Sequence, residues 1–229
     1  MNIFQETSAE QEKEKIESEL RSFGFSKFTI KKSNITTTQI AEHIGTIALP
    51  LSIQKITPRT KDKLQTNTYS GNFGLDAFPL HTDLAHWSTP PHYVILRCIQ
   101  PAEEVKTLLL DFKKILSPED SSTLSRALFR PRRSLENKVS LLRLSENEKL
   151  RWDSLFLQPV NATAKNLAGR ILEKINNTVK IEVNLASNKD CLILDNWRIL
   201  HGRTAVPEHC KNRILERIYL SSMQGAHNV

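Results

Sequence analysis

Asp195-Asn196-Trp197-Arg198-Ile199-Leu200-His201-Gly202-Arg203 is the most informative stretch of this 229-residue chain. A second motif, His81-Thr82-Asp83, lies about 120 positions earlier. On a strand, residues two apart point to the same face. We therefore expect His81 and Asp83 to face one point from a single short strand, and His201 to reach that point from a distant strand lying opposite.

Two imidazoles and one carboxylate suggest a metal site. This ligand set can occupy one face of an Fe(II) ion and leave three coordination positions open. Taken alone, His-x-Asp is weak evidence, because the pattern is common by chance and ordinary polar residues explain it equally well. Five other histidines also compete for the role: His43, His86, His92, His209 and His227.

Composition favours one globular domain spanning residues 1–229, since 39% of the residues are hydrophobic and 25% are charged. No apolar run approaches the ~18 residues that a membrane span needs. The polar N-terminus lacks the apolar stretch of a signal peptide. We therefore expect a cytoplasmic protein with no membrane partner. Three widely separated cysteines predict neither a disulfide framework nor a zinc site.

The formal net charge of +7 permits an acidic substrate or a nucleic-acid partner. The densest basic cluster contains Arg126, Arg130, Arg132 and Arg133. A solvated loop or helix end is the simpler interpretation, and a patch for an anionic partner is the alternative. No interleaved aromatic residues or known nucleic-acid motif accompany the cluster, so charge alone does not predict nucleic-acid binding.

Hydrophobic periodicity predicts a mainly β protein with flanking helices. Many short strands with few helices favour an antiparallel sandwich or barrel. Residues 57–74 are polar and predict a loop before the His81-Thr82-Asp83 motif. Thr7 or Ser8, Thr36 to Thr38 and Ser117 are the candidate helix caps. The expected helices are 9–23, 37–44, 117–128 and 166–178, and the main expected strands are 25–30, 93–99, 107–110, 191–194 and 215–221.

The order and spacing of these motifs resemble the taurine dioxygenase and clavaminate synthase-like family of Fe(II)/2-oxoglutarate-dependent oxygenases, including gamma-butyrobetaine hydroxylase. The resemblance covers roughly Phe78 to Leu220. Its matching stretches are Phe78-Pro79-Leu80-His81-Thr82-Asp83, Pro90-Pro91, Leu96-Arg97-Cys98, Lys106-Thr107-Leu108-Leu109-Leu110-Asp111, the Asp195 to Arg203 motif, and Arg213-x-x-x-Arg217.

The resemblance implies a double-stranded β-helix, or jelly roll. The core would span 75–222, with an insert at about 112–180, after an N-terminal helix–strand–helix unit in 1–50. His81, Asp83 and His201 match the iron ligands, and Thr107 and Arg213 match the residues that hold the distal carboxylate of 2-oxoglutarate. A guanidinium and a hydroxyl suit a carboxylate, because charge-assisted bidentate bonds are strong and directional.

Four further residues are candidate substrate contacts by their position in the motifs: Arg217, Trp87, His86 and Asn67. Each has a simpler alternative, namely a structural arginine, a core tryptophan, an ordinary polar histidine or a solvated loop. Arg203 is expected to pair with a nearby carboxylate, such as Asp195, and so to brace the Asp195 to Arg203 motif.

The implied function is hydroxylation of an unactivated carbon in a small, anionic or amino-acid-like metabolite, with dioxygen and 2-oxoglutarate as co-substrates. One alternative is an oxygenase that acts on a protein, a carrier-tethered residue or nucleic acid. Another is a non-catalytic jelly-roll binding protein. The sequence leaves open the substrate, the carbon attacked, the choice between hydroxylation, desaturation and cyclisation, and whether the chain forms a homo-oligomer.

Overall fold

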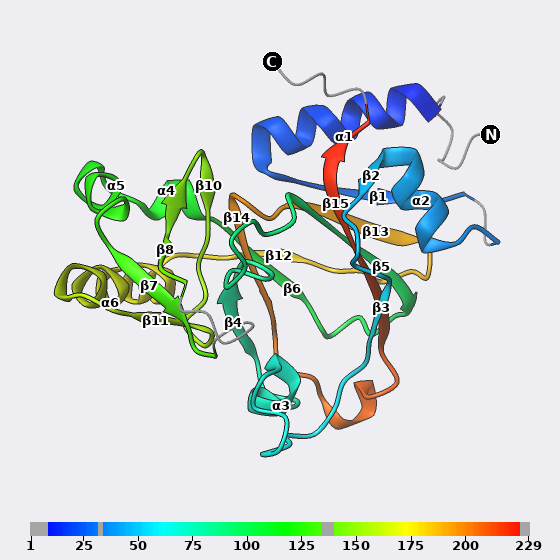
Figure 1. Cartoon of the computed structure of the whole chain (residues 1–229). Coiled ribbons are helices and arrows are strands. Elements are labelled where there is room, and N and C mark those ends of the chain that lie inside the picture. Colours follow the sequence, from blue (N-terminus) through cyan, green and yellow to red (C-terminus); the bar gives the residue numbers. More distant parts are fainter. Residues whose placement is uncertain (1–8, 32–33, 134–139, 225–229) are drawn as a thin grey trace.

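The computed structural model describes residues 9–31, 34–133 and 140–224, and two antiparallel sheets form its centre (Figure 1). The larger sheet has the order β1 (Phe25–Thr29), β13 (Asp190–Asp195), β5 (Tyr93–Gln100), β15 (Ile214–Met223) and β2 (Gly45–Ile47), with β3 (Gln54–Ile56) also on β15. The smaller sheet has the order β12 (Ile181–Val183), β6 (Thr107–Asp111), β14 (Ile199–Arg203) and β4 (Phe78–His81). This arrangement confirms the mainly β fold class and is consistent with a jelly roll.

Alternation along the strands builds the core between the two sheets. In β5, Val94, Leu96 and Cys98 share this core, whereas Ile95 packs on the opposite face of the sheet. This is the period of two that a strand buried on both faces requires. The core between the sheets also contains Leu109, Val183, Leu185, Leu192, Leu194, Ile199, Leu215 and Tyr219.

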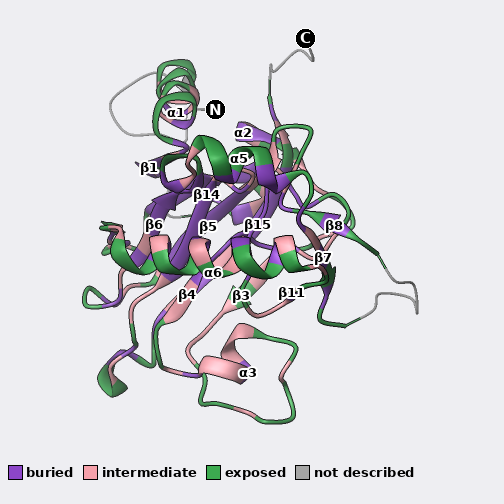
Figure 2. Ribbon diagram, turned by 90° about the vertical axis from the view of Figure 1, so that its left-hand side faces the viewer, coloured by how far each residue is buried: buried purple, intermediate pink, exposed green. Residues whose placement is uncertain are grey.

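Two helices cover the outer face of the larger sheet: α1 (Ala9–Phe23) and α2 (Thr37–Ile44) (Figures 1 and 2). Their apolar residues, including Ile16 and Ile40, pack with Ile95 and Ile193 of the sheet. Thr36 caps α2 in a capping box with Gln39, which confirms one of the predicted caps. Ser117 is confirmed as well, because it caps α5 (Pro118–Leu124) in a capping box with Asp120. The candidates Thr7 and Ser8 lie outside the described residues.

The insert covers the outer face of the smaller sheet. Leu80, Leu110 and Leu200 of that sheet share a core with Leu167 and Ile171 of helix α6. The insert contains α4 (Phe112–Ile115), α5 (Pro118–Leu124), β7 (Leu128–Pro131), β8 (Leu142–Arg143), β9 (Ser145–Glu146), β10 (Lys149–Leu150), β11 (Leu157–Pro159) and α6 (Ala162–Asn177).

Within the described ranges, no helix is long and apolar enough to cross a membrane.

Three sequence predictions are wrong in detail. Helix α6 begins at Ala162, after the cap Asn161, and not at 166 as expected. The helix expected over 117–128 ends at Leu124, because Leu128 starts β7 and pairs with β8. The segment expected to be a loop contains the short helix α3 (Tyr69–Phe73), which Thr68 caps. At Leu128, pairing with a distant strand overrides the local pattern. In the expected loop, Thr68 is a local cap that the polar composition of the segment obscured. The remaining helical element is a 3₁₀ turn, η1 (Glu208–Cys210).

Gly202 allows β14 to lie close to β4. A Cβ at this position would sit 2.5 Å from the carbonyl oxygen of Phe78, and backbone cannot move aside cheaply. We expect Gly202→Ala to lower the free energy of unfolding by about 1–3 kcal/mol. Gly169→Ala is the control: it lies inside α6 with no atom within 4 Å of an added Cβ, and we expect it to stabilise by about 0.5–1 kcal/mol. Urea unfolding of both variants tests the pair, and similar effects would contradict the prediction.

Asp195, the last residue of β13, gives folding a dependence on pH. Burial raises the pKa of its carboxyl to about 6, above the unfolded value of about 3.9. The folded form therefore binds this proton more tightly, and the resulting stability is lost as pH rises through about 6. Burial also lowers the pKa of the adjacent His92 to about 4, which keeps that ring neutral above pH 5.

We expect Asp195→Asn to be more stable than the unaltered protein at pH 7–8, with the advantage shrinking towards pH 5. The amide oxygen can still accept the hydrogen bond that the Trp197 amide now donates to Asp195 Oδ1 at 3.0 Å. Thermal unfolding of both proteins from pH 5 to pH 8 measures the difference. A constant difference across this range would refute the assignment.

Candidate metal centre

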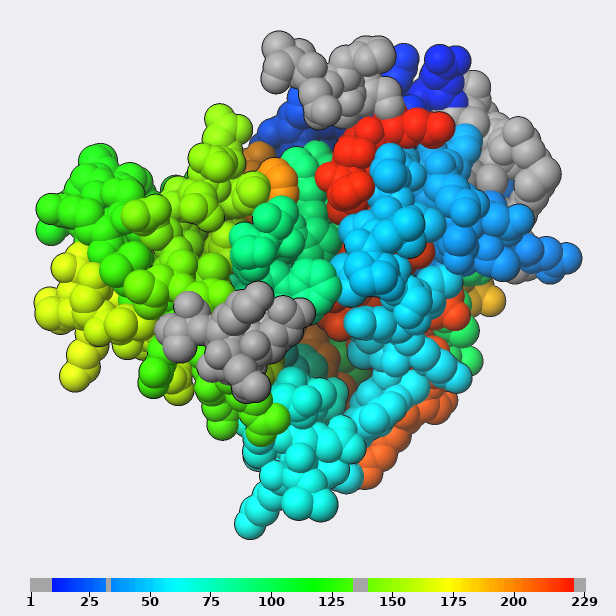
Figure 3. All heavy atoms as spheres, viewed as in Figure 1, coloured from blue at the N-terminus to red at the C-terminus, as the bar shows by residue number. Residues whose placement is uncertain are grey.

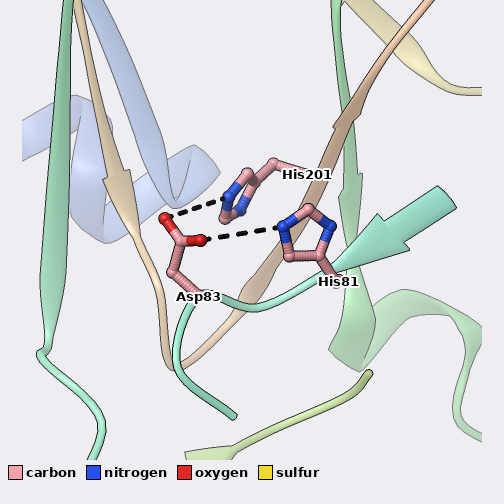
Figure 4. Close-up of side chains that lie close together, drawn as sticks. All are labelled: His81, Asp83 and His201. Carbon is pink, nitrogen blue, oxygen red and sulfur yellow. Dashed lines mark ion pairs between the residues drawn. The ribbon is translucent and has the colours of Figure 1, made fainter. Parts of the chain in front are cut away.

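His81, Asp83 and His201 converge at one buried point (Figure 4). His81 ends β4, and His201 is its register partner on β14. The Nε2 atom of His81 lies 3.7 Å from Oδ1 of Asp83, and Nε2 of His201 lies 3.5 Å from Oδ2. These separations exceed hydrogen-bond lengths and suit three donors that share one ion at metal–ligand distances of about 2.0–2.2 Å. The structure therefore brings together the three residues predicted as ligands.

Asp83 reaches this point by a different route from the one expected. The prediction that His81 and Asp83 share a strand face is wrong, because β4 ends at His81 and Asp83 lies in the following turn. Leu84, the next residue, has a positive φ of 54°. Asn196 holds this turn: its Oδ1 accepts from the Asp83 amide at 2.7 Å, and its Nδ2 donates to the Asp83 carbonyl at 3.0 Å.

The neighbours of His81 fix its ring and leave Nε2 pointing at the centre. Its Nδ1 lies 2.9 Å from the carbonyl oxygen of Pro79, and a proton on Nδ1 makes Nε2 the ligand atom. Tyr69 of α3 stacks on the imidazole with ring centroids 4.0 Å apart. Hydrogen bonding and packing of this kind orient metal-binding histidines in proteins.

Arg217 keeps the Asp83 carboxylate charged. Its Nη1 donates to both carboxylate oxygens at 2.8 and 2.9 Å. Burial raises the pKa of Asp83, but the charges of Arg217 and His201 outweigh it and hold that pKa well below its usual range. Gln54 of β3 accepts from Nε and Nη2 of Arg217 and so fixes the guanidinium. Nothing in the local sequence singled out Gln54, since its role depends on the pairing of β3 with β15.

A cavity of about 440 Å³ opens beside the three residues. This volume lies in the range that small-molecule ligands occupy. In Figure 3 the surface is hollowed next to the cyan segment around residues 57–75, which supplies part of the lining. The cavity wall includes five of the predicted co-substrate and substrate residues: Asn67, His86, Thr107, Arg213 and Arg217.

Arg213 is a buried cation that faces this cavity. Thr107 starts β6 and Arg213 immediately precedes β15, and both are about 95% buried. Among the residues that the structure describes, the Arg213 guanidinium has no hydrogen bond or ion pair, and burial lowers its pKa. A buried charge without a partner is costly, so an anionic ligand would stabilise this side of the cavity.

The predicted substrate contacts divide into two groups. His86, Asn67 and Arg217 line the cavity, whereas Trp87 does not. The carbonyls of Trp87 and Ser88 accept hydrogen bonds from Arg151, a fully buried residue of the insert. Arg151 therefore holds the segment that follows Asp83, and Trp87 is not part of the cavity wall.

Asp153 is a cavity residue that the sequence did not reveal. Its side chain is 2% exposed, and its Oδ1 accepts from the amides of Leu155 and Phe156 at 2.7 Å. Burial raises its pKa. In the sequence it reads as one acidic residue among many in the insert, and only the packing of the insert against the small sheet places it at the cavity.

The expected pairing of Arg203 with Asp195 is wrong. Arg203 ends β14, whereas Asp195 precedes that strand, so the strand carries the two side chains apart. Arg203 donates instead to the carbonyl oxygens of Gly74 and Asp76 at 2.5 and 3.0 Å, and lies 3.7 Å over the ring of Phe78. It therefore braces the segment leading into β4.

No protein-family model matches the sequence, and no curated protein does. Solved structures do match the fold. The non-haem iron oxygenase OrfP in complex with Fe and alpha-ketoglutaric acid gives a TM-score of 0.71 at 17% identity, over 94% of this chain and 81% of that one. An asparagine oxygenase with Fe(II), 3-hydroxyasparagine and succinate gives 0.70 at 16%, over 92% and 79%. PvcB from Pseudomonas aeruginosa gives 0.65 at 15%, over 93% and 84%.

Sequence identities this low establish the likeness of fold and leave the chemistry to the residues of the site. Two of these neighbours are non-haem iron oxygenases, and the match extends over nearly the whole chain. The chain therefore has the fold of the non-haem iron oxygenases, as its resemblance to the taurine dioxygenase and clavaminate synthase-like family predicted.

Proposed function

We propose that this chain is an Fe(II)- and 2-oxoglutarate-dependent dioxygenase that hydroxylates a small amino-acid-like or anionic metabolite. The observation that carries the proposal is the buried meeting of His81, Asp83 and His201 at the wall of a ligand-sized cavity. Two imidazole nitrogens and an ionised carboxylate on one side, with open space on the other, suit Fe(II) that must also bind co-substrates.

Thr107 and Arg213 are the proposed receptor for the distal carboxylate of 2-oxoglutarate. Both are buried at the same cavity as the metal ligands, and the Arg213 guanidinium has no partner in the described part of the chain. A carboxylate would supply the missing counter-charge through charge-assisted hydrogen bonds. Alpha-ketoglutaric acid in one structural neighbour supports this choice of co-substrate.

The substrate class rests on the cavity and on the neighbours. The cavity is small, and both cationic and anionic side chains line it, including Lys55, Arg59 and Asp153. Such a lining suits a ligand that carries both charges, as an amino acid does. Structural neighbours are bound to 3-hydroxyasparagine, 3-hydroxyarginine and L-canavanine, which supports an amino-acid-like substrate here.

When bound, Fe(II) would supply dioxygen activation, with 2-oxoglutarate giving up two electrons and carbon dioxide to become succinate. His81, Asp83 and His201 would hold the ion. Arg217 keeps Asp83 ionised and directed at the imidazoles. Thr107, Asp153 and Arg213 are buried beside the three ligands, so the inner part of the cavity would limit water around the reacting carbon. Less water strengthens the electrostatic contacts to the substrate.

A larger substrate is the second candidate. The arginines of the cluster Arg126, Arg130, Arg132 and Arg133 are exposed on or beside β7. Arg133 also donates to Thr66, next to the cavity residue Asn67. A polyanion or an acidic protein segment could contact these charges while it presents one group to the cavity. The complete set of ligands and of Thr107 and Arg213 argues against a non-catalytic binding protein.

The first test is succinate formation by iron-reconstituted protein with 2-oxoglutarate, with and without pooled L-amino acids. We expect turnover that one pool stimulates, and no turnover in His81→Ala, because two donors hold Fe(II) poorly. His209→Ala is the matched control, since this exposed histidine contacts Glu104 and does not line the cavity. Equal succinate formation in His81→Ala and in the unaltered protein would refute the metal assignment.

Arg213→Gln tests the co-substrate site. Loss of a hydrogen bond to a charged group costs about 1.5–3 kcal/mol, so we expect 2-oxoglutarate affinity to fall roughly 10- to 100-fold. Titration calorimetry with the Co(II)-loaded protein measures the affinity directly. Arg126→Gln removes an exposed charge of the same kind and should leave it unchanged. Unchanged affinity in Arg213→Gln would remove this residue from the role.

A further inference from the structure

We propose that Asn196 is the positioning residue for Asp83, and that its side-chain amide sets the strength of metal binding without touching the metal. The part of this inference that concerns the metal rests on the proposed function. The part that concerns the conformation of Asp83 rests on the hydrogen bonds alone, and the two parts are tested separately.

The side-chain amide of Asn196 is fully buried, and both its oxygen and its nitrogen make hydrogen bonds. Its Oδ1 accepts from the Asp83 amide at 2.7 Å, and its Nδ2 donates to the carbonyls of Asp83 at 3.0 Å and Pro91 at 2.9 Å. The side chain has no exposed surface. One oxygen and two amide protons thus meet three backbone groups from a segment more than 100 positions earlier in the chain.

Asp83 needs such a contact because no sheet fixes it. β4 ends two residues earlier, and Asp83 lies in a turn. Both backbone groups of Asp83 bind one rigid amide, which fixes its backbone and therefore the direction of its Cα–Cβ bond. Arg217 then holds the carboxylate at the other end.

The same contact couples the two metal motifs. Asn196 lies five positions before His201, on the connection between β13 and β14. The adjacent Trp197 donates from Nε1 to the Pro90 carbonyl at 3.0 Å and stacks on His92 at 3.8 Å. The segment that leads to His201 therefore hydrogen-bonds to the turn that contains Asp83. A shift of either segment would change the distance between His201 and Asp83.

Titration calorimetry with Co(II), used in place of Fe(II), tests the metal part of the proposal. We expect Asn196→Ala to weaken Co(II) binding about 10- to 100-fold, the usual effect of removing a residue that orients a metal ligand. Asn161→Ala is the matched control. Asn161 also makes three hydrogen bonds, accepting from Ala164 and Leu128 and donating to Arg126, but it holds the start of α6 away from the cavity.

Both variants lose stability, so loss of stability alone does not separate them; a change in Co(II) affinity in folded protein does. Equal Co(II) affinity in Asn196→Ala, Asn161→Ala and the unaltered protein overturns the positioning role. A selective loss in Asn196→Ala supports it.

Amide hydrogen exchange in the metal-free protein tests the conformational part without any variant. We expect the Asp83 amide to exchange as slowly as amides in β4, although it lies in a turn, because Asn196 accepts its hydrogen bond. Fast exchange at Asp83 in the unaltered protein overturns the proposal even where Asn196→Ala does not fold. If the unaltered protein binds no Co(II), the proposed function fails. Slow exchange at the Asp83 amide would then still support the part of the proposal in which Asn196 fixes the conformation of Asp83.

Discussion

The pairing of β14 with both β4 and β6 is the constraint on which the site depends. It makes His201 the register partner of His81 and places Thr107 beside Arg203 at the other end of the strand. Gly202 permits this pairing, since the carbonyl of Phe78 occupies the space that a Cβ would need. With the small sheet fixed in this way, two imidazoles meet across adjacent strands, and the Asp83 carboxylate joins them from the turn.

Charge balance gives the site its chemical character. Asp83 has Arg217 as a partner, and that ion pair keeps the carboxylate ionised in a buried setting. Arg213 has no partner among the described residues, whereas the Asp153 carboxyl accepts from two backbone amides and lies near His81 and Tyr69. The ion pair at Asp83 and the unpaired charge of Arg213, at one small cavity, suit a metal ion and an anionic co-substrate.

Local patterns predicted the helices and strands well, and the turns and side-chain contacts between them less well. Strands β5, β6, β13 and β15 and helices α1 and α2 follow their expected ranges, because period and capping act over a few residues. The argument that His81 and Asp83 share a strand was wrong although both reach the candidate metal centre, because Asn196 of the distant motif sets the conformation of the turn. The role assigned to Arg203 was wrong for a related reason: the direction of β14 decides which neighbours its side chain meets.

The sequence by itself determined the fold class and the identity of the three candidate ligands, because these depend on hydrophobic alternation and on the types and order of a few residues. Only the tertiary structure decided that Gln54 and Asp153 reach the cavity and that Trp87 does not. It also decided that the side chain of Asn196 hydrogen-bonds to the backbone of Asp83. Each of these outcomes depends on the packing of segments far apart in the chain, and short-range patterns hold no information about which distant backbone a side chain will meet.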